Sequence, residues 1–353
     1  MEQRKKTRKF LITHYQRYPR LQIQDLLKFL HQSSFGCEHM VTDLDAVIER
    51  IRKESEIGSC EGTHLKDELD GEYSRIHLSY LQQGLSVETL GTLFLKSAQN
   101  EPKGIHALEE KLCIAKELLC EKELPFSVKA FEEATSEWKR NGYPALHHSD
   151  KFREVYHPSY RVIANRYVPF LPVLAKIDEM LQEKSVVIAI EGGSASGKTT
   201  FSEMLKDIYD CNVLHMDDFF LRPEQRTPER FAEAGGNIDR ERFLEEVLMP
   251  LSKNETISYR RLDCSTFTMC PSVEIIPKKL TIIEGAYSMH PAFEKYYDLS
   301  VFLDVSKELQ KQRIEKRNTA QMVKRFFEEW IPLENIYFSE MKVKERCNLS
   351  ITV

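Results

Sequence analysis

The second half of the chain alternates short apolar runs with longer polar segments. Each run is short enough to be a strand and is followed by an acid or a glycine: Val186–Ile190, Val213–Met216, Leu280–Ile283 and Leu299–Leu303. Short apolar runs of this kind are typical of strands that are buried on both faces. The alternation of such runs with helical patterns predicts a parallel sheet covered by helices.

The first half of the chain has a helical pattern instead. Amphipathic stretches at Leu21–Leu30, Leu44–Ile51 and Ile105–Leu119 place apolar residues at helical spacing. A segment rich in prolines and aromatic residues, Tyr156–Pro172, predicts a strapped-down connection rather than a flexible linker. Because the chain is long enough for two independent cores, we expect a mainly helical N-terminal domain over residues 1–176 and an α/β domain over residues 177–353.

Composition narrows the classes of function. A net charge of −5 over 353 residues argues against a general nucleic-acid binder, which usually carries a basic excess. No segment approaches the roughly 20 apolar residues of a membrane span. The eight cysteines include no C-x-x-C pair, which favours reduced thiols. We therefore expect a cytoplasmic protein that binds neither nucleic acid nor membranes. The sequence leaves open whether the chain forms a homo-oligomer.

One motif indicates specific chemistry. The segment Gly192–Thr199 fits the pattern G-x-x-x-x-G-K-[ST], between the run Val186–Ile190 and a helical pattern over Thr200–Asp210. Strand, glycine loop and helix together aim backbone N–H groups at a phosphate. A Gly/Ser turn with a solvated lysine is the simpler alternative. We expect Lys198 to reach the β- and γ-phosphates and Thr199 to bind Mg²⁺. The residues expected to hold the nucleotide are Gly192, Gly193, Ser194, Ala195, Ser196, Gly197, Lys198, Thr199 and Thr200.

Acidic residues follow two of the expected strands. Asp217 and Asp218 come after Val213–Met216, and Glu284 comes after Leu280–Ile283. Asp217 is a candidate for accepting the proton of an acceptor hydroxyl or for holding a metal. Glu284 has the place of a second carboxylate linked to the metal. The alternatives are a helix cap or turn for the aspartate pair and a solvated strand end for Glu284.

Basic residues follow the last of these strands. Arg313 and Arg317 belong to an expected helix after Leu299–Leu303, and their spacing puts them on one side of it. Such a pair can grip phosphate oxygens, so we expect Arg313 to act in catalysis and Arg317 to bind substrate. A solvated charged face fits the same spacing.

Three stretches together resemble the uridine kinase and phosphoribulokinase family of P-loop kinases. They are Ile190–Thr199, His215–Phe220 and Ile282–Tyr287, and the resemblance covers roughly residues 184–345. It implies a P-loop NTPase fold that uses ATP and Mg²⁺. It also implies that Asp217 is the base near the acceptor hydroxyl and that Phe220 lines the acceptor pocket. Asp239, in turn, matches the aspartate that holds the acceptor's hydroxyls.

The chain departs from the family pattern beside the expected acceptor pocket. Uridine kinases place a Tyr-Asp-Phe and a histidine near the position of Tyr259, which we expect to bind substrate, whereas this chain has Leu262-Asp263-Cys264 and then Phe267. The departure weakens the case for pyrimidine recognition. An insert over Gln225–Gly236, with Arg226 and Arg230, is consistent with a differently shaped acceptor pocket.

The sequence thus predicts an ATP-dependent phosphotransferase with an alcohol group of a nucleoside or related metabolite as acceptor. One alternative is a P-loop kinase for another acceptor, such as pantothenate or a sugar phosphate. A second alternative is a nucleotide-dependent switch or ATPase that acts on a protein partner. The Asp217–Phe220 motif and Asp239 favour a kinase, because a switch needs no acceptor pocket. The role of the N-terminal half is not indicated by any motif.

Overall fold

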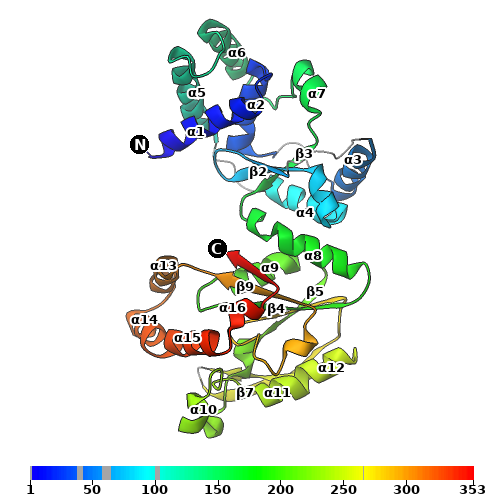
Figure 1. Cartoon of the computed structure of the whole chain (residues 1–353), viewed down its shortest axis with the longest axis vertical. Helices are drawn as coiled ribbons and strands as arrows, with labels where there is room; N and C mark the ends of the chain where they lie inside the picture. Colours follow the sequence, from blue (N-terminus) through cyan, green and yellow to red (C-terminus); the bar gives the residue numbers. More distant parts are fainter. Residues whose placement is uncertain (1, 38–42, 58–64, 100–103, 265) are drawn as a thin grey trace. The chain divides into compact units, whose positions relative to one another are not determined.

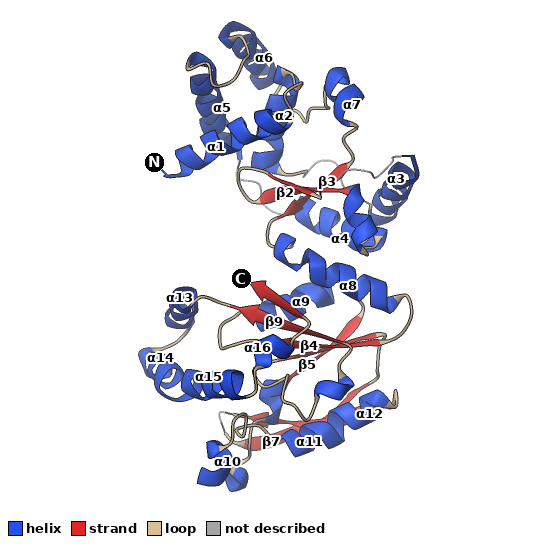
Figure 2. Cartoon of the chain, in the orientation of Figure 1, coloured by secondary structure: helices blue, strands red, loops and turns tan. Residues whose placement is uncertain are grey.

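The computed structural model describes residues 2–37, 43–57, 65–99, 104–264 and 266–353. The chain divides into two compact units, Met1–Ala175 and Lys176–Val353. Figure 1 follows the chain from blue to red through these units, and Figure 2 separates the helices from the strands.

Unit 1 combines helices with a small antiparallel sheet. Its sheet has the order β1-β2-β3, formed by Lys66–Glu68, Tyr73–His77 and Tyr160–Ala164. Strands β2 and β3 pair with Ile76 opposite Arg161. The helices are α1 (Glu2–Arg17), α2 (Ile23–Phe35), α3 (Leu44–Ile57), α4 (Val87–Ala98), α5 (Gly104–Cys120), α6 (Val128–Arg140) and α7 (Asp150–Tyr156).

The sheet of unit 1 corrects one expectation from the sequence. Residues 156–172 were expected to form a connection, but residues 160–164 are β3 and α8 (Leu171–Leu181) begins at Leu171. Val162 and Ile163 are buried in β3, and Tyr160 and Arg161 are largely buried beside them. The prolines flank this strand rather than interrupt it, so they do not prevent its pairing. A short strand with Tyr and Arg in it carries too little apolar pattern to be recognised alone.

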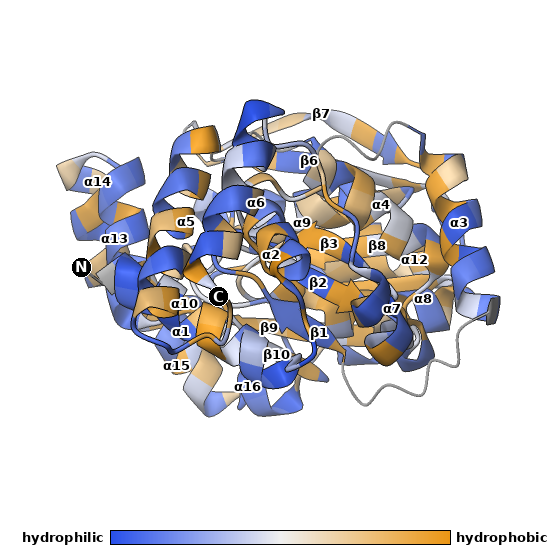
Figure 3. Ribbon diagram, turned by 90° about the horizontal axis from the view of Figure 1, so that it is seen from above, coloured by the Kyte–Doolittle hydropathy of each residue, from blue (hydrophilic) through white to orange (hydrophobic). Residues whose placement is uncertain are grey.

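Unit 2 is built on a five-stranded parallel sheet, as the sequence predicts. The order is β10-β9-β4-β8-β5, and each neighbouring pair is parallel. The strands are β4 (Val186–Glu191), β5 (Cys211–His215), β8 (Leu280–Glu284), β9 (Leu299–Asp304) and β10 (Leu349–Thr352). The central strands are almost wholly buried, and β8 is orange for hydrophobic in Figure 3. Burial of each large apolar side chain contributes about 1.5–3 kcal/mol to stability.

Helices cover both faces of this sheet. Helix α9 (Lys198–Ile208) packs on β4, β5 and β8 through Phe201 and Leu205, which are buried. On the other side in Figure 1, α15 (Ile331–Glu340) and α16 (Val343–Arg346) bring Tyr337 and Val343 into a core with Ala189. The remaining elements are α10 (Pro228–Ala232), α11 (Arg240–Phe243), α12 (Met249–Ser252), α13 (Lys307–Arg317), α14 (Ala320–Arg325) and a hairpin of β6 (Ile257–Asp263) and β7 (Thr268–Ile275).

Two helical runs in unit 2 contain a π-helical turn, and each turn precedes a proline. Leu244–Leu248 leads into α12 with Pro250, and Phe326–Trp330 leads into α15 with Pro332. Proline lacks an N–H and clashes with the carbonyl of the preceding turn, so a regular α-helix cannot pass through it unchanged. A wider turn relieves that clash. Residues 320–340 therefore form one helical run with a local change of pitch before α15.

Candidate functional site

The glycine loop Gly192–Thr199 connects the carboxyl end of β4 to the first turn of α9. Two of its residues need glycine. Gly192 has φ of +148°, and a Cβ there would lie 2.6 Å from the carbonyl oxygen of Leu303. Gly197 has φ of +98°, a conformation that other residues adopt only with strain. The loop therefore has the tight, concave backbone that presents N–H groups to a phosphate.

Lys198 and Thr199 are held at the start of α9. The Lys198 ammonium donates hydrogen bonds to the carbonyl oxygens of Gly192 at 2.8 Å and Gly193 at 3.0 Å. Its charge therefore lies over the loop itself. The Thr199 hydroxyl donates to Glu284 Oε1 at 3.1 Å. The structure thus brings together the lysine, the threonine and the second acid that the sequence singled out.

The acids lie at the carboxyl ends of β5 and β8. Glu284 is buried, and its Oε1 is 2.6 Å from His215 Nδ1. Burial raises the pKa of the Asp217 carboxyl, and the charge of Lys198 acts against that rise. Asp217 retains exposed side-chain surface, so it lies in a recess that is open to solvent. A raised pKa makes a carboxylate a better proton acceptor.

Asp218 and Tyr259 form a pair next to Asp217. The Tyr259 hydroxyl donates to Asp218 Oδ2 at 3.0 Å, and the Tyr259 ring stacks on Phe219. Burial raises the pKa of Asp218, and the bond from Tyr259 lowers it. Tyr259 itself is buried. The structure thus places Tyr259 behind Asp218, where it can orient that carboxylate.

Helix α13 supplies cationic and amide groups to the loop. Arg313 donates to the carbonyl oxygen of Ala195 at 3.1 Å, and Gln310 donates to that of Ser194 at 2.8 Å. Arg317 is exposed one turn further on. Of the two predicted arginines, the structure therefore brings Arg313 to the loop and leaves Arg317 on the surface.

The residues expected around the acceptor hydroxyl are only partly accessible. Asp239 is 2% exposed, and it accepts hydrogen bonds from the backbone N–H of Arg242 at 3.2 Å and from Gln225 at 2.9 Å. Its carboxylate also lies 3.7 Å from the guanidinium of Arg222. Phe220 is half-buried and pairs with Ile238. Asp239 therefore caps α11 and is enclosed by cationic and amide side chains.

Two further acids contact the loop, and sequence reasoning missed both. Glu191, at the end of β4, accepts the N–H of Gly192 at 2.8 Å, the N–H of Met289 at 3.0 Å and the hydroxyl of Tyr337 at 3.0 Å. Burial raises its pKa to about 7. Glu334, on α15, accepts two bonds from Ser194. An acid at the end of a buried strand was a readable signal for Glu191, but no local signal marks Glu334.

The chain's oxygen ligands suit magnesium. The Thr199 hydroxyl and the carboxylates of Glu284 and Asp217 are the hard oxygen donors that Mg²⁺ prefers. Thr199 and Glu284 are within hydrogen-bond distance of each other. These three residues therefore fit the role of holding the ion beside the phosphate loop.

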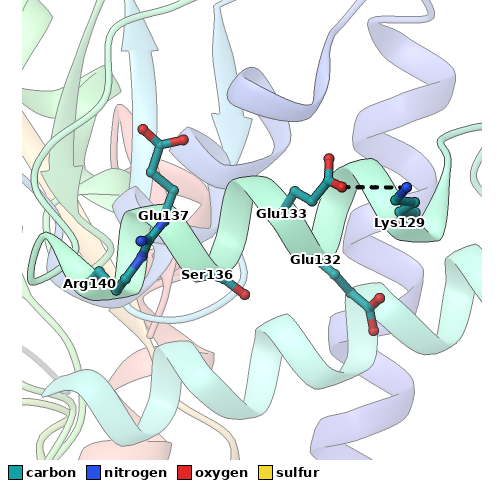
Figure 4. Close-up of a pocket in the computed structure, with 6 residues that line it drawn as sticks. All are labelled: Lys129, Glu132, Glu133, Ser136, Glu137 and Arg140. Carbon is teal, nitrogen blue, oxygen red and sulfur yellow. Dashed lines mark ion pairs between the residues drawn. The ribbon is translucent and has the colours of Figure 1, made fainter.

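Polar side chains also converge in unit 1, where the Asp67 carboxylate accepts the Tyr18 hydroxyl at 2.6 Å and lies 3.1 Å from His77 Nε2, but the phosphate loop belongs to unit 2. A shallow groove along α6 is lined by Lys129, Glu132, Glu133, Ser136, Glu137 and Arg140 (Figure 4). All six come from one helix, and only the pair Lys129 and Glu133 is linked, at 3.9 Å. Within the ranges that the structure describes, no helix is long and apolar enough to cross a membrane. The same ranges contain no group of three metal-binding side chains of the His, Cys, Asp and Glu type.

Comparison with known proteins finds a family model and relatives that are similar to part of unit 2. Residues 187–321 match the model of the Phosphoribulokinase / Uridine kinase family. The chain is 26% identical over 151 residues to Uridine kinase-like protein 4 of Arabidopsis thaliana, covering 40% of this chain and 32% of that protein. It is 25% identical over 138 residues to Phosphoribulokinase of Synechocystis, covering 36% of this chain and 40% of that protein. The chain thus spans about a third of the length of these relatives.

A solved structure titled as a possible uridine kinase from Bacillus stearothermophilus is 18% identical. It covers 51% of this chain and 98% of its own, with a TM-score of 0.39. The family match confirms the resemblance predicted from the three sequence stretches. The matched residues, 187–321, lie in unit 2 and include the phosphate loop, Asp217 and Glu284.

Proposed function

We propose that the protein transfers the γ-phosphate of ATP to the hydroxyl group of a small molecule. One observation carries the proposal: the phosphate loop, Asp217 and Glu284 all lie at the carboxyl ends of neighbouring parallel strands. In open α/β sheets, ligands bind beyond those strand ends. The family match of residues 187–321 supports the same chemistry.

The residues divide the reaction between them. The loop N–H groups and Lys198 hold the phosphates, and Arg313 adds positive charge where the transferred group passes. Asp217 accepts the proton of the acceptor hydroxyl while the hydroxyl oxygen forms a bond to the γ-phosphorus. The bond from that phosphorus to the bridging oxygen breaks, and ADP leaves with the electron pair. Bound Mg²⁺, held by Thr199, Asp217 and Glu284, would neutralise charge on the phosphate oxygens.

The acceptor is a nucleoside or a related metabolite in the first form of this proposal. A specific observation favours a second form. Because Asp239 is enclosed by Gln225, Arg222 and Arg242, it offers little free carboxylate surface for sugar hydroxyls. The second form is a kinase whose acceptor carries its own negative charge, such as pantothenate or a sugar phosphate.

Cationic groups near Asp217 support the second form. The guanidinium of Arg226 stacks on Phe267 at 4.3 Å and donates to the carbonyl oxygen of Leu221 at 3.0 Å, and it forms no ion pair with a described residue. Cys264, in the same hairpin tip as Phe267, has its sulfur 4.0 Å from the carbonyl oxygen of Asp217. Arg226 is close enough to lower the pKa of the Cys264 thiol, which burial raises overall. A guanidinium that faces a backbone carbonyl rather than a carboxylate suits a carboxylate or phosphate on the acceptor.

A panel of acceptors tests both forms. ADP release would be followed with uridine, cytidine, pantothenate and ribulose 5-phosphate, each at the same Mg·ATP concentration. Stimulation by any of them supports the kinase, and stimulation by the anionic pair alone supports the second form. Arg226→Gln should then raise KM for the anionic acceptor about tenfold with little change in kcat. Arg166→Gln is a matched control, since Arg166 also stacks on a ring, that of Tyr167.

The same assay also tests the alternative function, a nucleotide-dependent switch or ATPase that acts on a protein partner. A rate that no acceptor changes and that a protein partner stimulates would replace the kinase proposal. We also propose a cytoplasmic location, where ATP is available. Cysteines such as Cys211 and Cys347 are free thiols, which suits a reducing compartment.

A further inference from the structure

A carboxylate from a distant helix lies inside the phosphate loop. Glu334 Oε2 accepts the backbone N–H of Ser194 at 2.8 Å, and Glu334 Oε1 accepts the Ser194 hydroxyl at 2.6 Å. The two residues are 140 positions apart. The Glu334 side chain is nearly enclosed, since the residue is 5% exposed. Both of its oxygens are therefore engaged by the third residue of the loop.

Helix α15 is fixed in the position that delivers this carboxylate. Tyr337 lies three residues after Glu334, is fully buried, and donates its hydroxyl to Glu191, which in turn accepts the N–H of Gly192. Residues i and i+3 share a helix face, so one face of α15 contacts the loop at two points. The π-helical turn before Pro332 sets the pitch at which that face meets the loop.

The loop backbone is shaped to receive the carboxylate. A Cβ on Gly193 would lie 3.5 Å from Glu334 Oε2 and 3.2 Å from Gln310 Nε2. Glycine at this position therefore gives room to Gln310, which donates to the carbonyl oxygen of Ser194, while Glu334 accepts the N–H of the same residue.

The groups that stabilise the Glu334 carboxylate are of the kind that stabilise a bound phosphate. Burial raises the pKa of Glu334, and the charge of Lys198 opposes that rise. In the described part of the chain no cation lies within ion-pair distance of Glu334, and Lys198 directs its ammonium to Gly192 and Gly193. In such loops a phosphate oxygen accepts hydrogen bonds from backbone N–H groups and a hydroxyl, and it is attracted by the charge of the loop lysine.

We propose that Glu334 is a competing anion built into the phosphate loop, and that nucleotide binding has to displace its carboxylate. The inference rests on the proposed use of this loop for ATP. The negative charge of Glu334 beside Ser194 repels a triphosphate, and its carboxylate occupies the N–H and the hydroxyl of Ser194 that could otherwise bind a phosphate. Glu334 therefore sets how tightly the enzyme holds nucleotide, and it keeps the empty loop in its binding shape.

Nucleotide titration of the full chain tests the proposal. The dissociation constant for Mg·ATP would be measured by isothermal titration calorimetry for the parent and for Glu334→Gln, with no acceptor present. The amide keeps the shape and an acceptor oxygen but removes the charge. We expect the dissociation constant to fall about tenfold, as befits loss of a like charge within several ångströms of a polyanion. Glu340→Gln is the matched control, because Glu340 is exposed on the same helix.

The outcomes separate this proposal from the function itself. An unchanged or raised dissociation constant in Glu334→Gln overturns the competing-anion role and would leave Glu334 as a support of the loop alone. Binding in the parent together with no acceptor-stimulated turnover leaves the inference standing while the kinase proposal fails. Absence of ATP binding in parent and variant alike overturns both. A second variant, Glu334→Met, keeps the helix and removes every polar contact, so it should tighten binding too if the Gln variant melts early.

Discussion

The hydroxyl of Thr199 donates a hydrogen bond to the carboxylate of Glu284 across 3.1 Å. Thr199 lies in the first turn of helix α9, and Glu284 ends strand β8. The same carboxylate oxygen lies 2.6 Å from His215 Nδ1, at the end of β5. Neighbouring parallel strands thus deliver their terminal side chains to one point beside the loop, and the oxygens gathered there are those that suit Mg²⁺.

Lys198→Ala should abolish ATP-dependent turnover, by about a hundredfold or more, without loss of fold. The lysine stabilises charge that develops on the phosphoryl group, and its ammonium bonds only to loop carbonyls. Turnover at a fixed Mg·ATP concentration and a melting curve are the measurements. Lys206→Ala, an exposed lysine on the same helix, should retain activity. Equal turnover in Lys198→Ala and parent would remove the P-loop assignment.

Asp217→Asn should lower turnover by about a hundredfold, which is the usual effect of losing a general base. ATP affinity should change less, because the loop holds the phosphates. Asp218→Asn should have a smaller effect, since Asp218 is tied to the Tyr259 hydroxyl. Steady-state kinetics of both variants with a stimulating acceptor decide the matter. If Asp218→Asn is the more damaging change, the two aspartates have the opposite roles.

Glu191 should make the stability of unit 2 depend on pH. Burial raises its pKa in the folded state to about 7, from an ordinary value of 4.5. Between these values the folded chain binds more protons than the unfolded chain, so the free energy of unfolding falls as pH rises from about 4.5 to 7. The full effect is about 3 kcal/mol. Urea unfolding at several pH values should show that fall in the parent and a flatter profile in Glu191→Gln. Parallel profiles would argue against a titrating Glu191.

A fragment of residues 171–353, which keeps α8 whole, should bind Mg·ATP as tightly as the full chain. Every loop contact described above comes from unit 2, including those from Glu191, Arg313 and Glu334. A unit of this size can fold alone. Calorimetric titration of ATP, after a melting transition has been recorded, is the test. A folded fragment with much weaker binding would mean that unit 1 contributes to the nucleotide site.

The sequence predicts those parts of the site whose signals are local. Each of these signals is a short continuous stretch of the chain. They are the loop pattern, the buried strands β4, β8 and β9, and the strand ends that carry Asp217 and Glu284. Parallel pairing then places them together without further information. The family resemblance was recognisable for the same reason, since its three stretches are short and continuous.

The contacts made by distant helices could not be predicted in this way. Glu334 reaches Ser194 only because α15 folds back onto the loop, and nothing near residue 334 marks that approach. Asp239 shows the opposite case. The family resemblance implies an acceptor-binding carboxylate, but Gln225 of the insert and Arg222, just before the insert, enclose it. Strand β10 is short and polar at its exposed positions, so its pattern is too weak to be seen alone.

The missing side chain at Gly192 couples the phosphate loop to strand β9. The carbonyl oxygen of Leu303 lies 2.6 Å from the place that a Cβ on Gly192 would take. Because the two backbones approach so closely, the position of the loop depends on the position of β9. Strand β9 is held on its outer side by β10, with Ile351 opposite Leu303. A substitution in β10 that displaces Ile351 would therefore move β9 and, through the Leu303 carbonyl, the backbone of the phosphate loop.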